Sequence, residues 1–240
     1  MKKILIVCNQ HGNELLGDRL RASLEEKNSE ALKVLTFLNA NPEAKRLGVR
    51  FVDSDMNRAY RPKTVKLNYE EKKAREIIEL TKKFDLVLDM HTTTCMQPES
   101  VIVSSLNLEN SEANLFLSSL NINQIVEMNE PIARDSLIGN VPHSLCFELN
   151  NKQINKCLNL IEEGILNYCF GKSKYPQKEL YQIDGIIEKN KENLRKKFTN
   201  LKRHGDGFYP FLTGSNNSYR TNPAYKYLGF KAKNKLRIKV

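Results

Sequence analysis

The sequence predicts an α/β protein in which helices flank a mixed, largely parallel central sheet, with a small β-rich part at the C-terminal end. Short apolar runs alternate with helix-like segments of about 10 to 15 residues, the pattern of parallel strands joined by crossover helices. After Gly171 the composition changes to one rich in Tyr, Gly, Pro and Asn. We therefore predict an α/β domain over residues 1–171 and a small basic, β-rich domain over residues 172–240.

The first elements are two apolar runs and two helical patterns. Residues 4–8, ILIVC, predict a buried strand, and their short apolar length argues against a signal peptide. Residues 13–27 predict a helix with leucines on one face. A second strand is predicted to end at the turn over residues 39–42. Residues 69–83 predict a surface helix, because charged residues surround a narrow apolar stripe.

The rest of this domain repeats the alternation. The segments FDLVLDMHTTT at 84–94, SVIVSSL at 100–106 and HSLCFELN at 143–150 predict strands. Helices are predicted near residues 110–120 and over residues 154–170, where the apolar positions recur with helical spacing.

The net charge of +10 is unevenly distributed. Residues 172–240 contain 17 Lys and Arg against 5 Asp and Glu, whereas residues 1–171 contain 21 against 23. Such a basic region can bind nucleic acid, attract small anions or keep the protein in solution. A nucleic-acid reader would interleave aromatic residues with the basic ones, and KENLRKKFTNLKRH at 191–204 contains only Phe198. The charge pattern therefore does not favour nucleic acid as a partner.

Membrane and disulfide signals are weak. No apolar run approaches the roughly 18 residues of a membrane span. Five cysteines without a CxxC pair indicate neither a disulfide framework nor a thiolate zinc site. We therefore predict a cytoplasmic protein without a membrane partner.

Candidate functional residues stand where apolar runs end, which is where open α/β sheets form ligand sites. His11 and Glu14 follow the first run, and His91 ends another. Two imidazoles and one carboxylate can bind zinc and leave a position for water, as catalytic zinc sites do. Glu148 lies inside the apolar run SLCFEL. Burying a charged side chain there is costly, which indicates a functional role. We predict that Glu148 takes the proton of the zinc-activated water.

Simpler interpretations exist for each residue alone. Glu14 can stabilise a helix N-terminus, which favours negative charge. His91 can be a hydrogen-bonded histidine at a strand end. Glu148 can face solvent from a half-buried strand. Chance is a weaker explanation for the position of all three residues at or near strand ends.

A polar loop forms a second cluster. Within nine positions it contains Arg50, Asp53, Asp55, Asn57 and Arg58. Two guanidinium groups and an amide suit bidentate recognition of a carboxylate. The alternative is a solvated loop with internal ion pairs.

Together these motifs resemble one family. HGNE at 11–14, NP at 41–42, RFVDSDMNR at 50–58, DLVLDMHTTT at 85–94 and FEL at 147–149 occur in the order and approximate spacing of the aspartoacylase and succinylglutamate desuccinylase family. The resemblance implies a zinc carboxypeptidase-like fold, with a zinc-binding catalytic domain and a C-terminal domain that narrows substrate access.

The resemblance also implies roles for individual residues. His11, Glu14 and His91 would bind one zinc ion per subunit. Glu148 would be the general base, which later protonates the leaving amine. Arg50 would polarise the scissile carbonyl and stabilise the oxyanion.

Substrate contacts follow from the same resemblance. Asn57 and Arg58 would hold a substrate carboxylate, and Tyr225 in NPAYKY matches a substrate-binding tyrosine across a gap. Thr92 is a further candidate contact. Arg134 is the nearest counterpart of an arginine that the family's aspartoacylases place somewhat closer to the catalytic glutamate.

These residues predict a zinc-dependent amidohydrolase acting on a small anionic N-acyl amino acid, with N-acetylaspartate as the first substrate to test. Two alternatives stay open: a zinc carboxypeptidase acting on short peptides, and a binder of nucleic acid or anionic surfaces with a vestigial metal site. Asp89 and Asp55 are predicted to support a ligand histidine and an arginine. A homo-oligomer is also left open.

Overall fold

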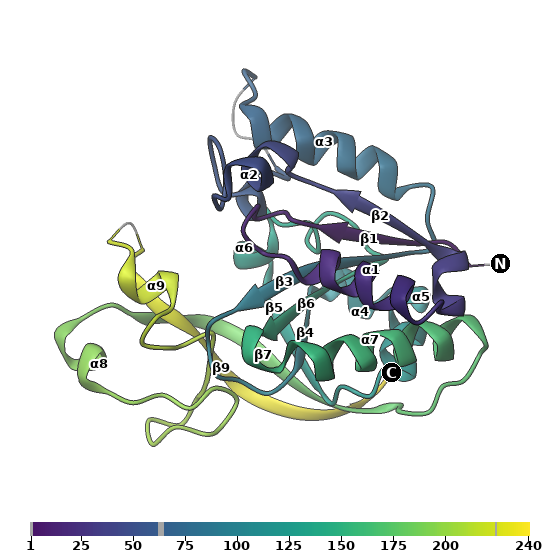
Figure 1. The fold of residues 1–240 in the computed structure, drawn as a ribbon. Coiled ribbons are helices and arrows are strands. Elements are labelled where there is room, and N and C mark those ends of the chain that lie inside the picture. The colour runs from purple at the N-terminus through teal and green to yellow at the C-terminus, as the bar shows by residue number, and fades with distance from the viewer. Residues whose placement is uncertain (1, 62–64, 224) are drawn as a thin grey trace.

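The computed structural model describes residues 2–61, 65–223 and 225–240. Nine strands among these residues form one sheet, in the order β2-β1-β3-β6-β4-β5-β7-β9-β8. Their bounds are β1 Ile4–Cys8, β2 Leu35–Asn39, β3 Leu86–Thr93, β4 Ser100–Val103, β5 Gln124–Met128, β6 Ser144–Asn150, β7 Gln177–Glu188, β8 Tyr209–Phe211 and β9 Tyr227–Lys239. Figure 1 shows the sheet twisting between helices.

The helices join and cover these strands. Their bounds are α1 Leu16–Glu26, α2 Pro42–Leu47, α3 Tyr69–Thr81, α4 Ser105–Leu108, α5 Ser111–Ser119, α6 Glu130–Ala133, α7 Ile154–Cys169, α8 Lys191–Arg195 and α9 Ser218–Thr221, with 3-10 turns η1 Glu30–Val34, η2 Met56–Arg58 and η3 Asn151–Gln153. No helix in the described ranges is long and apolar enough to cross a membrane.

The strand directions make the sheet mixed. β2, β1, β3 and β6 pair in parallel, as the short apolar runs joined by helices predict. β4 pairs antiparallel to β6, and β5 and β7 then run parallel to β4. The carboxyl ends of β1, β3 and β6 therefore meet at one edge, which is where the candidate residues lie.

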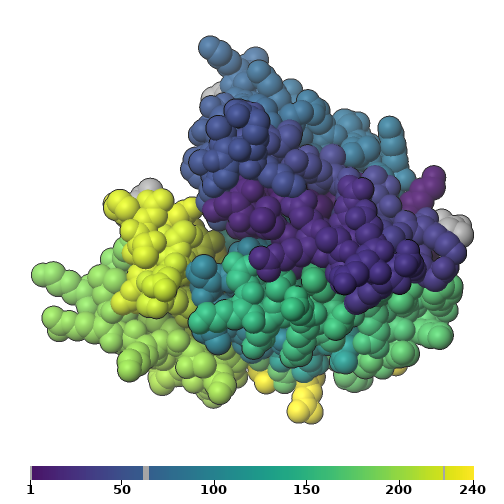
Figure 2. Space-filling model, in the orientation of Figure 1, coloured from purple at the N-terminus to yellow at the C-terminus, as the bar shows by residue number. Residues whose placement is uncertain are grey.

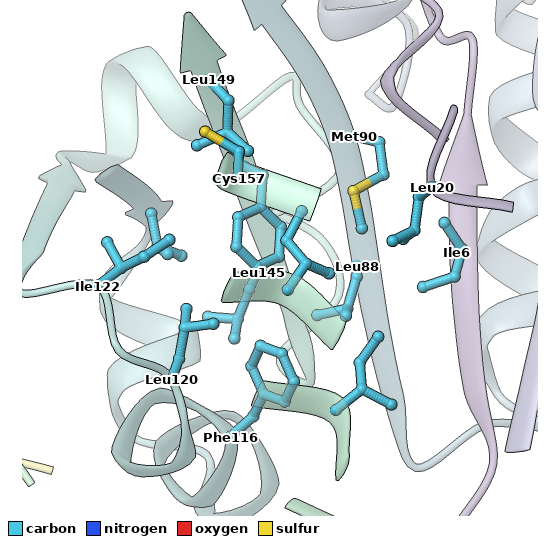
Figure 3. Close-up of a cluster of buried hydrophobic side chains, with 14 of the residues drawn as sticks. Ile6, Leu20, Leu88, Met90, Phe116, Leu120, Ile122, Leu145, Leu149 and Cys157 are labelled. Atoms are coloured by element: carbon cyan, nitrogen blue, oxygen red, sulfur yellow. The ribbon is translucent and has the colours of Figure 1, made fainter. Parts of the chain in front are cut away.

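Two cores fill the faces of the parallel half. Side chains from one face of the strands, such as Ile6, Leu88 and Met90, pack against α1, α5 and α7. Figure 3 shows them facing Leu20 of α1. The alternate strand residues pack with α3 and η2 on the other face. Strands buried on both faces explain the nearly continuous apolar runs in the sequence.

The C-terminal residues continue the sheet and also form a lobe beside it. β7 pairs with β5 in parallel and then with β9 in a long antiparallel ladder that reaches β8. Figure 1 shows this ladder leaving the main body toward α8 and α9. A third core packs residues of both parts, including Met128 of β5 and Phe230 of β9. The division at residue 171 falls between α7 and β7 and stays a prediction.

The helix predicted over residues 13–27 begins later, at Leu16. A tight turn comes first, in which Asn9 has a positive φ of 57° and its side chain donates to the Glu14 carbonyl at 2.9 Å. Gly12 is required in this turn, because a Cβ atom there would lie 2.2 Å from the Ala44 carbonyl carbon. The prediction that Glu14 stands in the first helical turn was therefore wrong. Glu14 belongs to the turn that presents His11.

Candidate metal centre

Three predicted ligands meet at the carboxyl end of the parallel strands. His11 and Glu14 come from the turn after β1, and His91 from β3. His11 Nδ1 lies 3.2 Å from His91 Nδ1, and the two Glu14 oxygens lie 2.8 Å from the first and 2.9 Å from the second. All three residues are buried, at 2%, 8% and 2% exposure for His11, Glu14 and His91. The three residues predicted as ligands from the sequence therefore do come together in the fold.

The spacing of these atoms fits a metal ion. Donor atoms about 2.0–2.1 Å from a tetrahedral zinc ion stand roughly 3.3 Å apart. Two neutral imidazole nitrogens 3.2 Å apart repel through their lone pairs unless a proton or a metal ion lies between them. The group of His11, Glu14 and His91 can therefore hold a metal ion, with one nitrogen from each ring and the carboxylate.

Each histidine is oriented by an aspartate on its far nitrogen. His11 Nε2 lies 3.0 Å from Asp55, and His91 Nε2 lies 3.1 Å from Asp89. Donation from each Nε2 leaves the Nδ1 lone pair free for a metal ion. Asp55 also accepts from Arg50 at 3.1 Å. Asp89 therefore contacts a candidate ligand histidine and Asp55 contacts an arginine, as predicted, while their supporting roles at a metal ion stay a prediction.

A series of hydrogen bonds connects Asp89 to residues deeper in the protein. Gln10 donates to Asp89 at 2.5 Å, and Tyr60 donates to Gln10 at 2.9 Å. This sequence of hydrogen bonds holds Asp89 so that it can orient His91.

Neighbouring charges set the protonation of the three candidate ligands. Burial opposes the protonated form of His91, but Asp89 and Glu14 outweigh it and raise the pKa of His91 well above its usual value. Burial likewise opposes ionisation of Glu14, but the two histidines hold its pKa well below its usual range. Protons therefore compete with a metal ion at the histidines, and acid should weaken metal binding.

We expect Asp89→Asn to reduce zinc affinity by about 10 to 100-fold, because a neutral amide oxygen accepts the His91 Nε2–H hydrogen bond more weakly than a charged carboxylate does. Zinc competition against a chromophoric chelator measures the effect. Asp85→Asn is the matched control, since Asp85 lies just before the same strand but is exposed and, within the described part of the chain, accepts only from the Lys3 amide at 2.7 Å. Equal affinities for the two variants would contradict an orienting role for Asp89.

Glu148 lies next to the three candidate ligands. Its backbone in β6 pairs directly with His91 in β3. Among the described residues, no side chain donates a hydrogen bond to its carboxyl group, which leaves both oxygens for a molecule in the pocket. Burial and the negative charge of Glu14 raise the pKa of Glu148 to about 7. Such a carboxyl group is suited to accept and return a proton near neutral pH.

A pocket of about 320 Å³ contains this centre. Its lining includes His11, Glu14, Arg50 and Glu148, together with Tyr219 from α9. Figure 2 shows the C-terminal segment in yellow beside the N-terminal segment in purple and blue on this face. The C-terminal lobe therefore contributes one side of the pocket.

The loop residues are placed unequally. Arg50 lines the pocket and donates to Glu14 at 3.3 Å. Asn57 also lines it, with its amide nitrogen 3.5 Å from His91 Nε2. Arg58 lines an adjoining pocket that shares Asn57 and Glu148. Thr92 lines the first pocket, and its backbone amide donates to Glu14 at 3.0 Å.

Two predicted substrate contacts lie outside the lining. Arg134 lines neither of these pockets; its exposed side chain pairs with Glu130 at 2.9 Å on α6. Its helical position, four residues after Glu130, explains this pairing. Tyr225 packs one layer out, with its ring 5.0 Å from that of Tyr219. Tyr219, which the sequence analysis missed, is the tyrosine that faces the site.

Comparison with known proteins agrees with this geometry. Residues 1–134, more than half of the chain, match the family model described as the succinylglutamate desuccinylase/aspartoacylase catalytic domain. The chain belongs to this family. The prediction made from its motifs is confirmed.

Individual members of the succinylglutamate desuccinylase/aspartoacylase family match part of the chain. A probable aspartoacylase of Trichodesmium erythraeum (strain IMS101) is 33% identical over 136 residues, covering 51% of this chain and 46% of the relative. The aspartoacylase of Danio rerio is 28% identical over 120 residues, covering 43% and 38%. The matched part thus spans less than half the length of these relatives.

Solved structures resemble the whole chain. Murine aminoacylase 3 superposes with a TM-score of 0.74 at 18% identity, covering 100% of this chain and 97% of that one. The succinylglutamate desuccinylase of Vibrio parahaemolyticus has a TM-score of 0.64 at 16% identity, covering 100% and 82%. These likenesses concern the fold, and they confirm the predicted carboxypeptidase-like architecture.

Proposed function

We propose that the protein is a zinc-dependent amidohydrolase that cleaves the acyl amide of a small anionic N-acyl amino acid. The observation that carries the proposal is the convergence of His11 Nδ1, His91 Nδ1 and the Glu14 carboxylate beside the free carboxyl group of Glu148. Membership of the family supports amide hydrolysis of N-acyl amino acids as the reaction class.

His11, Glu14 and His91 would hold the zinc ion. When bound, zinc supplies Lewis acidity, which lowers the pKa of a water molecule and polarises an amide carbonyl. Asp55 and Asp89 keep the two imidazoles oriented toward it.

Glu148 moves the proton in this proposal. Its carboxylate accepts a proton from the attacking water and returns it to the leaving amine as the carbon–nitrogen bond breaks. Burial and the charge of Glu14 raise the pKa of Glu148, which helps it to take up the proton and hold it until the amine leaves.

Two arginines would bind two different negative groups of the substrate, the developing oxyanion and the carboxylate. Arg50 is held by Asp55 at 3.1 Å with its guanidinium at the metal ligands, where it can stabilise the developing oxyanion. Arg58, next to Asn57 in the adjoining pocket, is placed to hold the substrate carboxylate. Both groups lie within η2 or the loop before it, so one short segment orients the substrate.

The direct test combines metal analysis with a panel of N-acetyl amino acids and dipeptides. Hydrolysis of the N-acetyl compounds that depends on added zinc and disappears with a chelator supports the proposal. Cleavage of dipeptides alone would favour a carboxypeptidase. Absence of any cleavage by zinc-loaded protein would refute amide hydrolysis.

The fall of kcat/KM at acidic pH should report the protonation of Glu148. Ionised Glu148 is needed to accept the proton, so activity falls as pH drops through its pKa. A cation at the three ligands favours the carboxylate and lowers that pKa from about 7. We therefore expect kcat/KM to fall about tenfold per pH unit below a midpoint at or under pH 7. Zinc content measured at each pH separates this from metal loss. A profile that stays flat even below about pH 4, where an ordinary carboxyl group is already protonated, would contradict the assignment.

A further inference from the structure

A second pocket of about 80 Å³ adjoins the metal centre. It shares Asn57, Glu148, Leu212 and Tyr219 with the first pocket, so one bound molecule can extend through both. Its remaining lining is mainly apolar, with Arg58, Asp89 and Ser136 as the polar members. The apolar members are Ile102, Met128, Ile132, Ala133, Ile138, Cys146 and Phe230.

This apolar wall is rigid and built into the core. Ile102, Met128, Ile138 and Phe230 are at most 6% exposed and belong to the core that joins the two halves of the sheet. They come from β4, from the end of β5, from the loop before β6 and from β9. Because these wall residues are buried in the packed core, the apolar character of the wall exists before a ligand arrives.

The charges of the second pocket favour a single carboxylate. Among the described residues that line it, Arg58 is the only cation, while Asp89 and Glu148 are acidic. Arg134 brings no second positive charge, since it is exposed and paired with Glu130. A second carboxylate in this pocket would lose its hydration against an apolar wall and would face two acidic side chains.

We propose that this second pocket takes the side chain of the amino-acid half of the substrate, and that this side chain is small, uncharged and apolar. The inference rests on the proposed function, in which Asn57 and Arg58 hold the α-carboxylate. With that carboxylate at Arg58, the side chain of the same amino acid enters the space bounded by Ile102, Met128 and Ile132. The preferred substrates are then N-acyl derivatives of residues such as leucine or methionine, which carry one carboxylate, and not of aspartate.

The test measures kcat/KM of the zinc-loaded full chain for N-acetyl-leucine, N-acetyl-methionine and N-acetylaspartate. We expect the leucine and methionine compounds to exceed the aspartate compound by at least about tenfold, since burying an unpaired charge is far costlier than burying a methyl group. Equal or better hydrolysis of N-acetylaspartate would overturn the inference and leave the proposed function standing. No hydrolysis of any of the three would count against the proposed function itself.

Binding gives a second readout that is independent of turnover. Calorimetric titration of zinc-loaded Glu148→Gln with N-acetyl-leucine and N-acetylaspartate should show the same order of affinity as the rates. The difference should be smaller, because the substitution removes one of the two acidic side chains while Asp89 and the apolar wall remain. The reverse order of affinity would overturn the inference.

Substitution of the wall should shift the preference. Ile132 is partly buried on the short helix α6, so Ile132→Arg adds a cation with little damage to the core. We expect it to raise the aspartate-to-leucine ratio of kcat/KM by at least about tenfold, while the uncharged control Ile132→Met keeps the ratio within about threefold. An unchanged ratio in Ile132→Arg would overturn the placement of the side chain. The wild-type panel decides the question even where this variant fails to accumulate.

Discussion

Glu148→Gln should bind zinc as the wild type does and lose hydrolysis by a factor of about 10² to 10⁴. The amide has nearly the same shape as the carboxyl group but cannot accept the proton of the attacking water. Glu148 is not among the three converging ligands, so the metal site keeps all its donors. Because no described side chain hydrogen-bonds to the Glu148 carboxyl group, the substitution also breaks no structural contact.

The measurement pairs zinc content per chain with kcat for the best N-acetyl amino acid. Glu127→Gln is the matched control, because Glu127 is a partly buried carboxylate on β5 that lines neither pocket and contacts Gln182 at 2.9 Å. It should keep both zinc and activity. A Glu148→Gln protein that holds zinc and hydrolyses at the wild-type rate would exclude Glu148 as the base.

The parallel half of the fold could be predicted because its strands are buried on both faces. Such strands give short continuous apolar runs, and these runs predicted β1, β3 and β6. β5 was missed, since its residues Gln124–Met128 include Gln124 and Glu127 and so interrupt the apolar run. The partial exposure of these two residues explains the pattern. The long β7 and β9 ladder was predicted only as a β-rich composition, because register depends on pairing between distant segments.

The convergence of the candidate ligands His11, Glu14 and His91 could be predicted for a similar reason. Each follows or ends an apolar strand, and strand ends of parallel sheets meet at one edge. Tyr219 was not found, because it reaches the pocket from a C-terminal segment without periodic pattern. The apolar wall of the second pocket was equally hidden, since core residues and pocket residues look the same in a sequence. Side-chain direction, which sent Arg134 to Glu130, is also decided by local packing.

His91→Ala should lose zinc binding more severely than Asp89→Asn, by more than about 10 to 100-fold, since a donor is removed and not only its orienting partner. His91 contacts His11 at 3.2 Å and Glu14 at 2.9 Å, so its loss opens the centre of the site. Activity should fall with the metal.

Zinc-dependent stability gives the sharpest readout of this loss. A ligand that binds only the folded protein stabilises it by about 2.7 kcal/mol at a concentration of 100 times Kd. His143→Ala is the control, because His143 precedes β6, lies 3.1 Å from the Thr81 carbonyl and lines neither pocket. Added zinc should therefore raise the Tm of the wild type and of His143→Ala. Added zinc should leave the Tm of His91→Ala unchanged. An equal zinc-induced rise in all three proteins would show that the metal binds elsewhere, because removal of His91 takes away one of three converging donors.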